Sequence, residues 1–431
     1  MGEPVTVPLW LFVAIAAFAL WSLLDRLLIP SGRWFVRRRL NRLIDRVNQR
    51  LAVEIKPFQL TKRQVLIDRL VFDPRVIEAI EAQAHESRKP REVLQAEARR
   101  YAREIVPAFN AYVYFRIGYW LAKRFARLLY RVRVGFSDES RLSAIDPKAT
   151  VVFVMNHRSN MDYVLVALLA SEHTALSYAV GEWARVWPLQ QLIRSMGAFF
   201  VRRNSNNPLY RRVLERYVHM ATQEGVPQAV FLEGGLSKDG KLRAPKLGML
   251  DYMLRGYDCE HARDIVFVPV GVNYDRVLED RTLVRALDPQ AKRRSPWFVI
   301  RTTLGFIGHN IWLMLRNRWL RFGYAAVCFG QPFSMREYCR ERHLNPTQLP
   351  QEARFAEIEK LAGRLMTAIG RQIPVVPTPL LAAVLLAEGD RGTDKLKLKA
   401  GFYQRVEALR STGRMVVVPT HTLEHTFETA L

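Results

Sequence analysis

The chain has 431 residues, of which 49% are hydrophobic and 11% aromatic, so it can bury a large core and is not a disordered chain. Lysine and arginine outnumber aspartate and glutamate by 65 to 41, and the net charge of +24 indicates an anionic partner such as nucleic acid, phospholipid headgroups or a phosphorylated small molecule. The three cysteines form no C-x-x-C pair, which suits a reducing compartment, and we expect no metal site.

The first predicted element is an apolar run over residues 7–24, VPLWLFVAIAAFALWSLL, which has 18 residues and no charge. This is about the length that a helix needs to cross the hydrocarbon core of a bilayer. We interpret the run as a transmembrane anchor. A cleaved signal peptide is the alternative, but no basic segment precedes the run and no clear cleavage site follows it.

A basic segment follows at residues 33–50, RWFVRRRLNRLIDRVNQR, with seven arginines and one aspartate. The positive-inside rule keeps such a segment on the cytoplasmic side of a membrane. We therefore expect residues 1–50 to form an anchor with a basic juxtamembrane helix, in a single-pass protein of the inner (cytoplasmic) membrane with the bulk of the chain on the cytoplasmic side. The basic segment can also lie on an anionic membrane surface, and a solvated basic helix is the alternative.

Three further regions differ in their periodicity. Residues 51–134 repeat apolar side chains every three or four positions, which predicts a helical N-terminal domain. Residues 135–333 alternate β-branched runs with helical stretches, which predicts an α/β domain. Residues 334–431 predict a helical C-terminal region. The amphipathic stretch at residues 295–320 suits either a membrane interface or the core.

One motif in the α/β domain can carry chemistry. NHRSNMD places His157 at the end of a predicted strand and Asp162 at the start of the next helix. If the connecting turn folds the carboxylate onto the imidazole, Asp162 fixes the tautomer and the other ring nitrogen can take a proton from a hydroxyl. Backbone N–H groups of the same turn are candidate donors to an oxyanion. A helix-capping aspartate near a hydrogen-bonded histidine is the alternative interpretation.

A second segment, GLSKDGKL at residues 235–242, comes within one residue of a P-loop. Leu242 stands where a P-loop has the serine or threonine that holds magnesium, and no Walker B partner follows. We therefore exclude a P-loop nucleoside triphosphatase. No helix-turn-helix, zinc or RNA-recognition signature is present either, so we expect no nucleic-acid partner.

Four blocks in chain order, NHRSNMD, MGAFFVRRN, VFLEGGLSKDGK and VFVPVGVNYD, resemble the four motifs of the glycerolipid acyltransferases. The fit is best to the bacterial-type glycerol-3-phosphate acyltransferases and the related dihydroxyacetone-phosphate acyltransferases. The resemblance implies a mixed-sheet α/β acyltransferase domain flanked by helical regions. It implies acyl transfer from acyl-CoA or acyl-carrier protein to a hydroxyl of glycerol 3-phosphate, beside membrane phospholipid, without cofactor, metal or covalent intermediate.

The resemblance also assigns residues to substrate binding: Arg202, Arg203, Glu233, Gly234, Ser237, Lys238 and Pro269. Arg202 would bind the substrate phosphate, to which a guanidinium fork is well matched. Glu233 and Gly234 would line the glycerol pocket, with a salt bridge between Glu233 and Arg202 as the alternative. Proline cannot donate to a strand ladder, so we expect Pro269 at the end or edge of its strand.

One departure from the family pattern concerns the acceptor. Just before the serine of its third motif the family usually has arginine, and this chain has Leu236. Lys238 can replace the charge, or the acceptor can differ. The alternatives are therefore an acyltransferase acting on lysophosphatidate or another lysophospholipid, and a non-catalytic membrane protein that binds anionic lipid or nucleic acid.

Overall fold

The structure is a computed structural model, and the residues that it describes are 8–11, 13, 15–18, 21, 55–137, 139–170, 174–181, 187, 189–202, 205–288, 322–389, 394–418 and 423–431. The chain divides into two compact units, Met1–Glu54 and Ile55–Leu431. The basic segment at 33–50, the stretch at 295–320 and part of the apolar run at 7–24 lie outside the described residues. Among the residues that are described, no helix combines the length and apolar character needed to cross a membrane.

The second unit is built on a mixed sheet, which confirms the predicted α/β class. In the described residues this sheet has eight strands in the order β1-β7-β6-β2-β5-β3-β4, with β8 paired to β6. The strands are β1 (Arg131–Phe136), β2 (Thr150–Met155), β3 (Ser177–Val180), β4 (Ala198–Phe200), β5 (Gln228–Phe231), β6 (Ile265–Tyr274), β7 (Tyr324–Phe329) and β8 (Phe333–Ser334). Pairs β2–β5, β2–β6, β3–β5, β3–β4 and β1–β7 are parallel, whereas β7 and β8 run antiparallel to β6.

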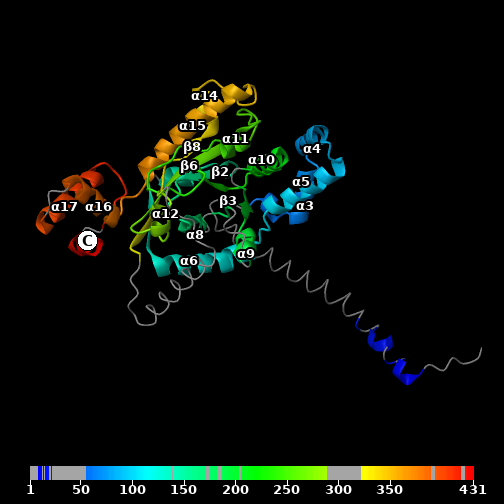
Figure 1. Ribbon diagram of the computed structural model, residues 1–431, viewed down its shortest axis with the longest axis horizontal. Coiled ribbons are helices and arrows are strands. Elements are labelled where there is room, and N and C mark those ends of the chain that lie inside the picture. The colour runs from blue at the N-terminus through cyan, green and yellow to red at the C-terminus, as the bar shows by residue number, and fades with distance from the viewer. Residues whose placement is uncertain are drawn as a thin grey trace, which may run out of the picture. The chain divides into compact units, whose positions relative to one another are not determined.

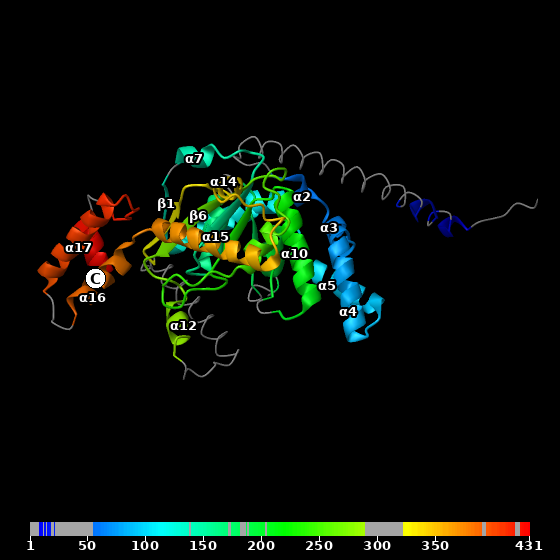
Figure 2. The same cartoon turned by 90° about the horizontal axis from the view of Figure 1, so that it is seen from above.

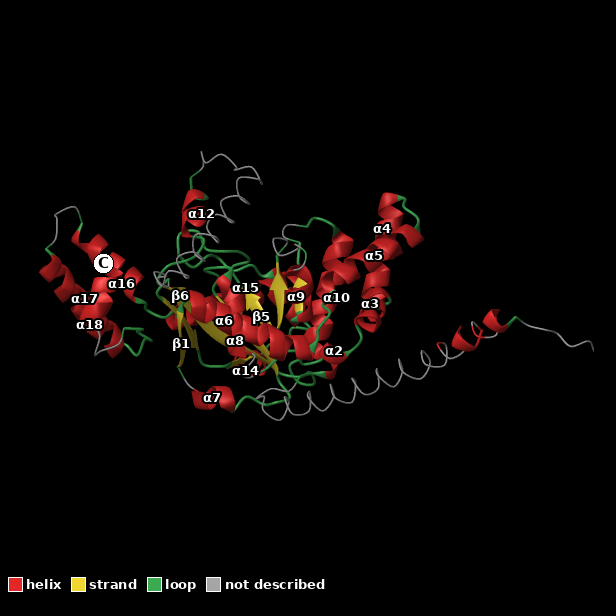
Figure 3. Ribbon diagram, turned by 90° about the horizontal axis from the view of Figure 1, so that it is seen from below, coloured by secondary structure: helices red, strands yellow, loops and turns green. Residues whose placement is uncertain are grey.

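Helices cover both faces of this sheet, with α6 and α8 on one side and α15 on the other (Figures 1 and 3). The described helices are α2 (Pro57–Leu60), α3 (Arg63–Val71), α4 (Pro74–Ser87), α5 (Arg91–Ile105), the π-helix η1 (Val113–Gly118), α6 (Tyr119–Leu129), α7 (Glu139–Ser143), α8 (Met161–Ala170), α9 (Leu189–Ser195), α10 (Pro208–Gln223), α11 (Gly248–Leu254), α12 (Asp280–Arg285), α14 (Met335–Glu341), α15 (Gln351–Gln372), α16 (Pro377–Glu388), α17 (Lys395–Ser411) and α18 (Leu423–Ala430).

The helices α3, α4 and α5 share one hydrophobic core with the sheet. Their buried side chains join those of α10, α11, α15 and strands β2 and β6 in a single cluster. Asp73 strengthens this contact: it caps α4 by accepting from the Arg75 N–H at 3.0 Å, and its carboxylate also pairs with the Arg216 guanidinium of α10 at 2.9 Å. The N-terminal helices are thus held against the α/β layer by both apolar packing and an ion pair.

The C-terminal helices α16, α17 and α18 have a small core of their own, centred on Phe402 and Phe427. Helix α15 comes before them and runs along β6 (Figure 2). Gly271 of β6 lies against the backbone of Gln372 at the end of α15, so closely that a Cβ at this position would collide with it. The close approach of helix and strand therefore requires glycine at this position.

The prediction that Pro269 ends or edges its strand was wrong. Pro269 lies in the middle of β6 and pairs in register with Val154 of β2. On its other side, β6 pairs with β8 through Phe267 and with β7 from Val270 onward. Pro269 falls at this change of partner, where its missing N–H removes no ladder bond and its carbonyl accepts from the Gly330 N–H at 2.7 Å.

Candidate active site

His157 lies just beyond the end of β2, in the turn that leads into α8. The preceding residue, Asn156, is fully buried and exchanges two hydrogen bonds with the backbone of Val272 in β6, at 2.8 and 2.9 Å. This amide continues the β2–β6 pairing past the last ladder residue. The position of His157 is therefore fixed by two central strands.

The turn brings His157 and Asp162 together, as the spacing predicted. His157 Nδ1 lies 2.8 Å from Asp162 Oδ2, and both side chains are buried. The same oxygen accepts from the backbone N–H groups of Arg158 and Ser159, at 2.7 and 3.1 Å. Asp162 thus caps the turn and orients the imidazole at the same time, so the two interpretations of this motif are compatible.

Tyr274, which was not among the residues predicted from the sequence, completes the surroundings of Asp162. Its hydroxyl donates to Asp162 Oδ1 at 2.5 Å. Burial, and then the negative charge of Asp162, raise the pKa of Tyr274 well above its ordinary value, so the phenol remains a donor. The available signal was the final residue pair of the fourth block, since Tyr274 ends the strand beside β2.

The second imidazole nitrogen of His157 remains unused. Nε2 is buried and has no hydrogen-bond partner. The ring stacks on Phe231 with centroids 4.1 Å apart, and the ring of Tyr163 lies nearly perpendicular to it with centroids 5.3 Å apart. A buried nitrogen with no partner costs free energy, so a site that leaves one open is suited to a hydroxyl from a ligand.

Glu233 holds His157 from the third block. Its Oε1 accepts the His157 N–H and its Oε2 accepts the Arg243 N–H, both at 2.9 Å. The backbone of Ser237 adds a third link, because its N–H donates to the His157 carbonyl at 2.8 Å. The buried carboxylate predicted at this position is therefore present, and backbone amides satisfy it rather than Arg202.

Glu279 holds the other end of the turn, and it too was not among the residues predicted from the sequence. This half-buried residue precedes α12. Its Oε2 accepts from the Ser159 hydroxyl at 2.8 Å and its Oε1 from the Asn160 N–H at 3.1 Å. Carboxylates from two distant parts of the chain thus clamp the turn that carries His157.

These contacts overturn the expectation that free amides of this turn stabilise an oxyanion. Each of the six backbone N–H groups from residue 157 to residue 162 already donates a hydrogen bond. In chain order, the acceptors are the Glu233 carboxylate, the Asp162 carboxylate for the next two, the Glu279 carboxylate, the Ser159 hydroxyl and the Ser159 carbonyl. A tight turn directs its amides inward, onto the carboxylates that stabilise it. Donors to an oxyanion must come from another segment.

The third block itself forms a loop. Gly234 has φ +67, and a side chain there would meet Lys246, so glycine is required. The Ser237 hydroxyl donates to the Lys241 carbonyl at 2.7 Å. Lys238 is exposed and its Nζ donates to the Ala286 carbonyl at 3.1 Å. Leu236, at the position where the family has arginine, is half-buried.

Arg202 is engaged with an acidic residue of α5. Its Nε and Nη2 donate to the two carboxylate oxygens of Glu104 at 2.9 and 2.6 Å, and the guanidinium lies 5.2 Å from the ring centroids of Tyr101 and Tyr210. Hydrogen bonding to Glu104 raises the pKa of Arg202. One edge of the guanidinium remains for another anion. Arg203 lies outside the described residues.

The described residues contain no group of three or more histidine, cysteine, aspartate or glutamate side chains placed to hold a metal ion. The chemical capacity of the site lies in one imidazole. Asp162 holds its Nδ1, Glu233 holds its backbone, and Nε2 is open to accept a proton. An imidazole held in this way has the chemical capacity to take a proton from a hydroxyl.

The fold and the site define an acyltransferase domain. Residues 133–273 match the family model described as Acyltransferase, and residues 310–431 match the glycerol-3-phosphate acyltransferase C-terminal region. These matches confirm the resemblance to the glycerolipid acyltransferases that the four blocks indicated.

Curated relatives agree with this assignment. The chain is 31% identical over 361 residues to the glycerol-3-phosphate acyltransferase of Ectopseudomonas mendocina (strain ymp), a match that covers 81% of this chain and 41% of the relative. It is 30% identical over 349 residues to the enzyme of that name from Pseudomonas entomophila (strain L48), covering 79% and 40%. The chain therefore spans about two fifths of the length of these relatives.

Among solved structures, the chain aligns with the 1-acyl-sn-glycerophosphate (LPA) acyltransferase of Thermotoga maritima. The TM-score is 0.32 at 17% sequence identity, and the alignment covers 59% of this chain and 78% of that one.

Proposed function

We propose that this protein transfers an acyl group from an acyl thioester to a hydroxyl of glycerol 3-phosphate, with His157 as the general base. The observation that carries this proposal is the state of the imidazole: Nδ1 is held by Asp162 at 2.8 Å, whereas the buried Nε2 has no partner. The names of the relatives support glycerol 3-phosphate as the acceptor. No cofactor takes part in the proposed reaction.

In the proposed reaction, His157 Nε2 takes the proton of the acceptor hydroxyl as its oxygen attacks the thioester carbonyl. The tetrahedral intermediate collapses with loss of the thiolate, which takes the proton back from the imidazolium. Asp162 stabilises the imidazolium while it exists, and general-base help of this kind contributes about 10² to 10⁴ in rate. The thioester is already activated, so no covalent enzyme intermediate is needed.

We further propose that the acyl donor is acyl-CoA or acyl-carrier protein and that the reaction takes place at the inner membrane. The apolar run at 7–24 and the arginines at 33–50 support attachment to a phospholipid bilayer with the second unit in the cytoplasm. Arg202 and Lys238 supply candidate cations for the acceptor phosphate.

An acceptor panel tests the proposal. Purified protein and labelled acyl-CoA are offered glycerol 3-phosphate, dihydroxyacetone phosphate, lysophosphatidate and other lysolipids, with His157→Ala as the control. We expect turnover with glycerol 3-phosphate. His157→Ala should abolish this turnover, and the variant should still unfold cooperatively on heating. Preference for a lysolipid would establish the alternative acceptor that was considered because Leu236 stands at the position of the family's arginine. Turnover that survives His157→Ala would contradict the assignment of His157 as the general base.

A further inference from the structure

The segment η1–α6, together with the preceding Tyr112, exposes a row of large apolar side chains. Its six exposed members are Tyr112 (45% exposed), Ile117 (41%), Trp120 (59%), Leu121 (40%), Phe125 (47%) and Leu128 (39%). On the opposite side of α6, Ala122 and Ala126 are buried where the helix packs on α8. Apolar exposure of this size along one helix marks an interaction surface.

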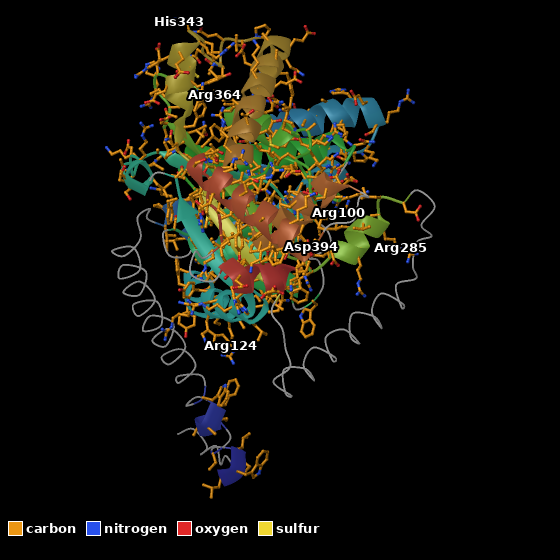
Figure 4. All side chains as sticks on the ribbon, turned by 90° about the vertical axis from the view of Figure 1, so that its left-hand side faces the viewer. Arg100, Arg124, Arg285, His343, Arg364 and Asp394 are labelled. Carbon is orange, nitrogen blue, oxygen red and sulfur yellow. The ribbon has the colours of Figure 1, made fainter. Side chains whose placement is uncertain are left out.

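The same segment carries an unneutralised positive charge. Residues 105–137 contain six lysines and arginines and no aspartate or glutamate; these cations are Arg116, Lys123, Arg124, Arg127, Arg131 and Arg133. In the described part of the chain none of the six forms an ion pair. Figure 4 shows Arg124 at the end of the second unit opposite His343.

A basic pocket lies beside this row. It has a volume of about 540 Å³ and is lined by Lys123 and Arg127 of α6, by Arg131 and Arg133 of the edge strand β1, and by Leu168 of α8. Arg131 and Arg133 approach the ring of Tyr324 at 5.9 and 5.7 Å, which leaves their charges unneutralised. A pocket with four cations and an apolar wall is suited to an anionic headgroup that is attached to an acyl chain.

We propose that this η1–α6 face, the six apolar and six basic residues named above, lies on the surface of an anionic phospholipid bilayer. The apolar row would enter the interface between headgroups and acyl chains, the flanking cations would meet lipid phosphates, and the pocket would hold one headgroup. A bilayer suits this face better than a protein partner does. The face has a ridge of apolar side chains bordered by unpaired cations, and an anionic bilayer has an apolar interior beneath a layer of anionic headgroups. This contact belongs to the second unit and does not depend on the catalytic proposal.

A depth measurement on the full chain tests the proposal. A spin label is attached at Phe125→Cys in a Cys259→Ser background, since the other two cysteines are buried, and the protein is reconstituted in phosphatidylcholine vesicles with or without phosphatidylglycerol. We expect phosphatidylglycerol to lower the label's accessibility to a water-soluble nickel chelate at least threefold and to raise its accessibility to oxygen. A label at the exposed Arg340 of α14 should stay accessible to water in both.

Two further variants separate charge from packing. The double substitution Arg124→Gln and Arg127→Gln should restore the accessibility of the Phe125 label to the nickel chelate. The control Arg340→Gln and Arg371→Gln removes the same charge elsewhere and should leave that accessibility low. A Phe125 label that is equally accessible to water in both vesicles would overturn the proposal. A label that phosphatidylglycerol shields from the chelate without raising its accessibility to oxygen would indicate a protein contact and overturn it as well.

Discussion

The hydroxyl of Tyr274 lies 2.5 Å from Asp162 Oδ1, on the side of the carboxylate opposite to His157. Asp162 therefore receives four donors, from His157, Tyr274 and two backbone amides of the turn. We expect Tyr274→Phe to lower kcat about tenfold with KM for both substrates unchanged, because an acceptor oxygen buried without its donor lets the carboxylate and the imidazole shift. Steady-state kinetics on both substrates measures this.

Tyr130→Phe is the matched control for Tyr274→Phe. Tyr130 packs its ring against Tyr274 with centroids 5.2 Å apart, but its hydroxyl donates to the Arg276 carbonyl at 2.8 Å instead of to Asp162. Loss of either hydroxyl should lower stability by about 1 kcal/mol. Equal losses of kcat in the two variants would refute a positioning role for Tyr274.

Glu233→Gln distinguishes a clamp from a substrate ligand. An amide can accept from only one of the two backbone amides that Glu233 now satisfies, so an unpaired buried donor should cost about 1–3 kcal/mol of stability. We expect a lower melting temperature and a lower kcat, with KM for glycerol 3-phosphate within about twofold of wild type, since a clamp acts through His157. A tenfold rise in that KM without loss of stability would favour the glycerol-binding role.

Arg202 is tested together with its partner Glu104. If the free edge of Arg202 binds the acceptor phosphate, Arg202→Ala should raise KM for glycerol 3-phosphate by about tenfold or more and leave KM for the thioester unchanged. Glu104→Gln keeps the guanidinium and should raise the same KM much less. If the pair is only structural, both variants will lower the melting temperature alike and leave both KM values unchanged.

The parts of this site that the sequence predicted are local. The strand signal and the five-residue spacing placed His157 and Asp162 in one turn, because the hydrogen bonds that join the two side chains and cap the turn lie within residues 157–162. Tyr274 follows Asp162 by 112 residues, and its contact exists only because β6 pairs with β2 in the register of Val154 with Pro269. No periodicity in the chain encodes that register.

Charge partners were the least predictable feature. A carboxylate at Glu233 was expected to find donors, but the choice between an arginine and two backbone amides depends on where the third-block loop closes. Arg202 pairs with Glu104, 98 residues earlier, because α5 packs beside β4. With 41 acidic residues in the chain, composition does not select one of them. The place of Pro269 likewise depended on a change of strand partner.

Gly271→Ala should test the packing of α15 on the sheet. A Cβ at Gly271 would collide with the backbone of Gln372 at the end of α15, and backbone cannot move aside as a flexible side chain can. We expect a loss of about 1–3 kcal/mol or more in urea unfolding. Gly248→Ala is the control, since nothing lies within 4 Å of a Cβ there, and its stability should be unchanged or about 0.4–1 kcal/mol higher. Comparable losses in both variants would contradict the close approach.

His219 should make the fold sensitive to acid. Burial, and next the charge of Arg216, lower the pKa of His219 to about 4 from its ordinary 6.5. Between these two pH values the unfolded chain binds a proton at His219 that the folded chain does not. The free energy of unfolding therefore falls as the pH drops from about 6.5 to about 4, and outside that window His219 adds no pH dependence. The loss by pH 4.5 amounts to about 2–3 kcal/mol.

Urea unfolding at pH 7 and pH 4.5 measures this effect in wild type and in His219→Gln, which removes the titrating group while it keeps a side chain of similar size. The variant should lose about 2–3 kcal/mol less stability than wild type over this interval. His85→Gln serves as the control, because His85 is exposed on α4 and its replacement should leave the pH dependence unchanged. If His219→Gln is as acid-sensitive as wild type, then the proton that destabilises the fold binds elsewhere.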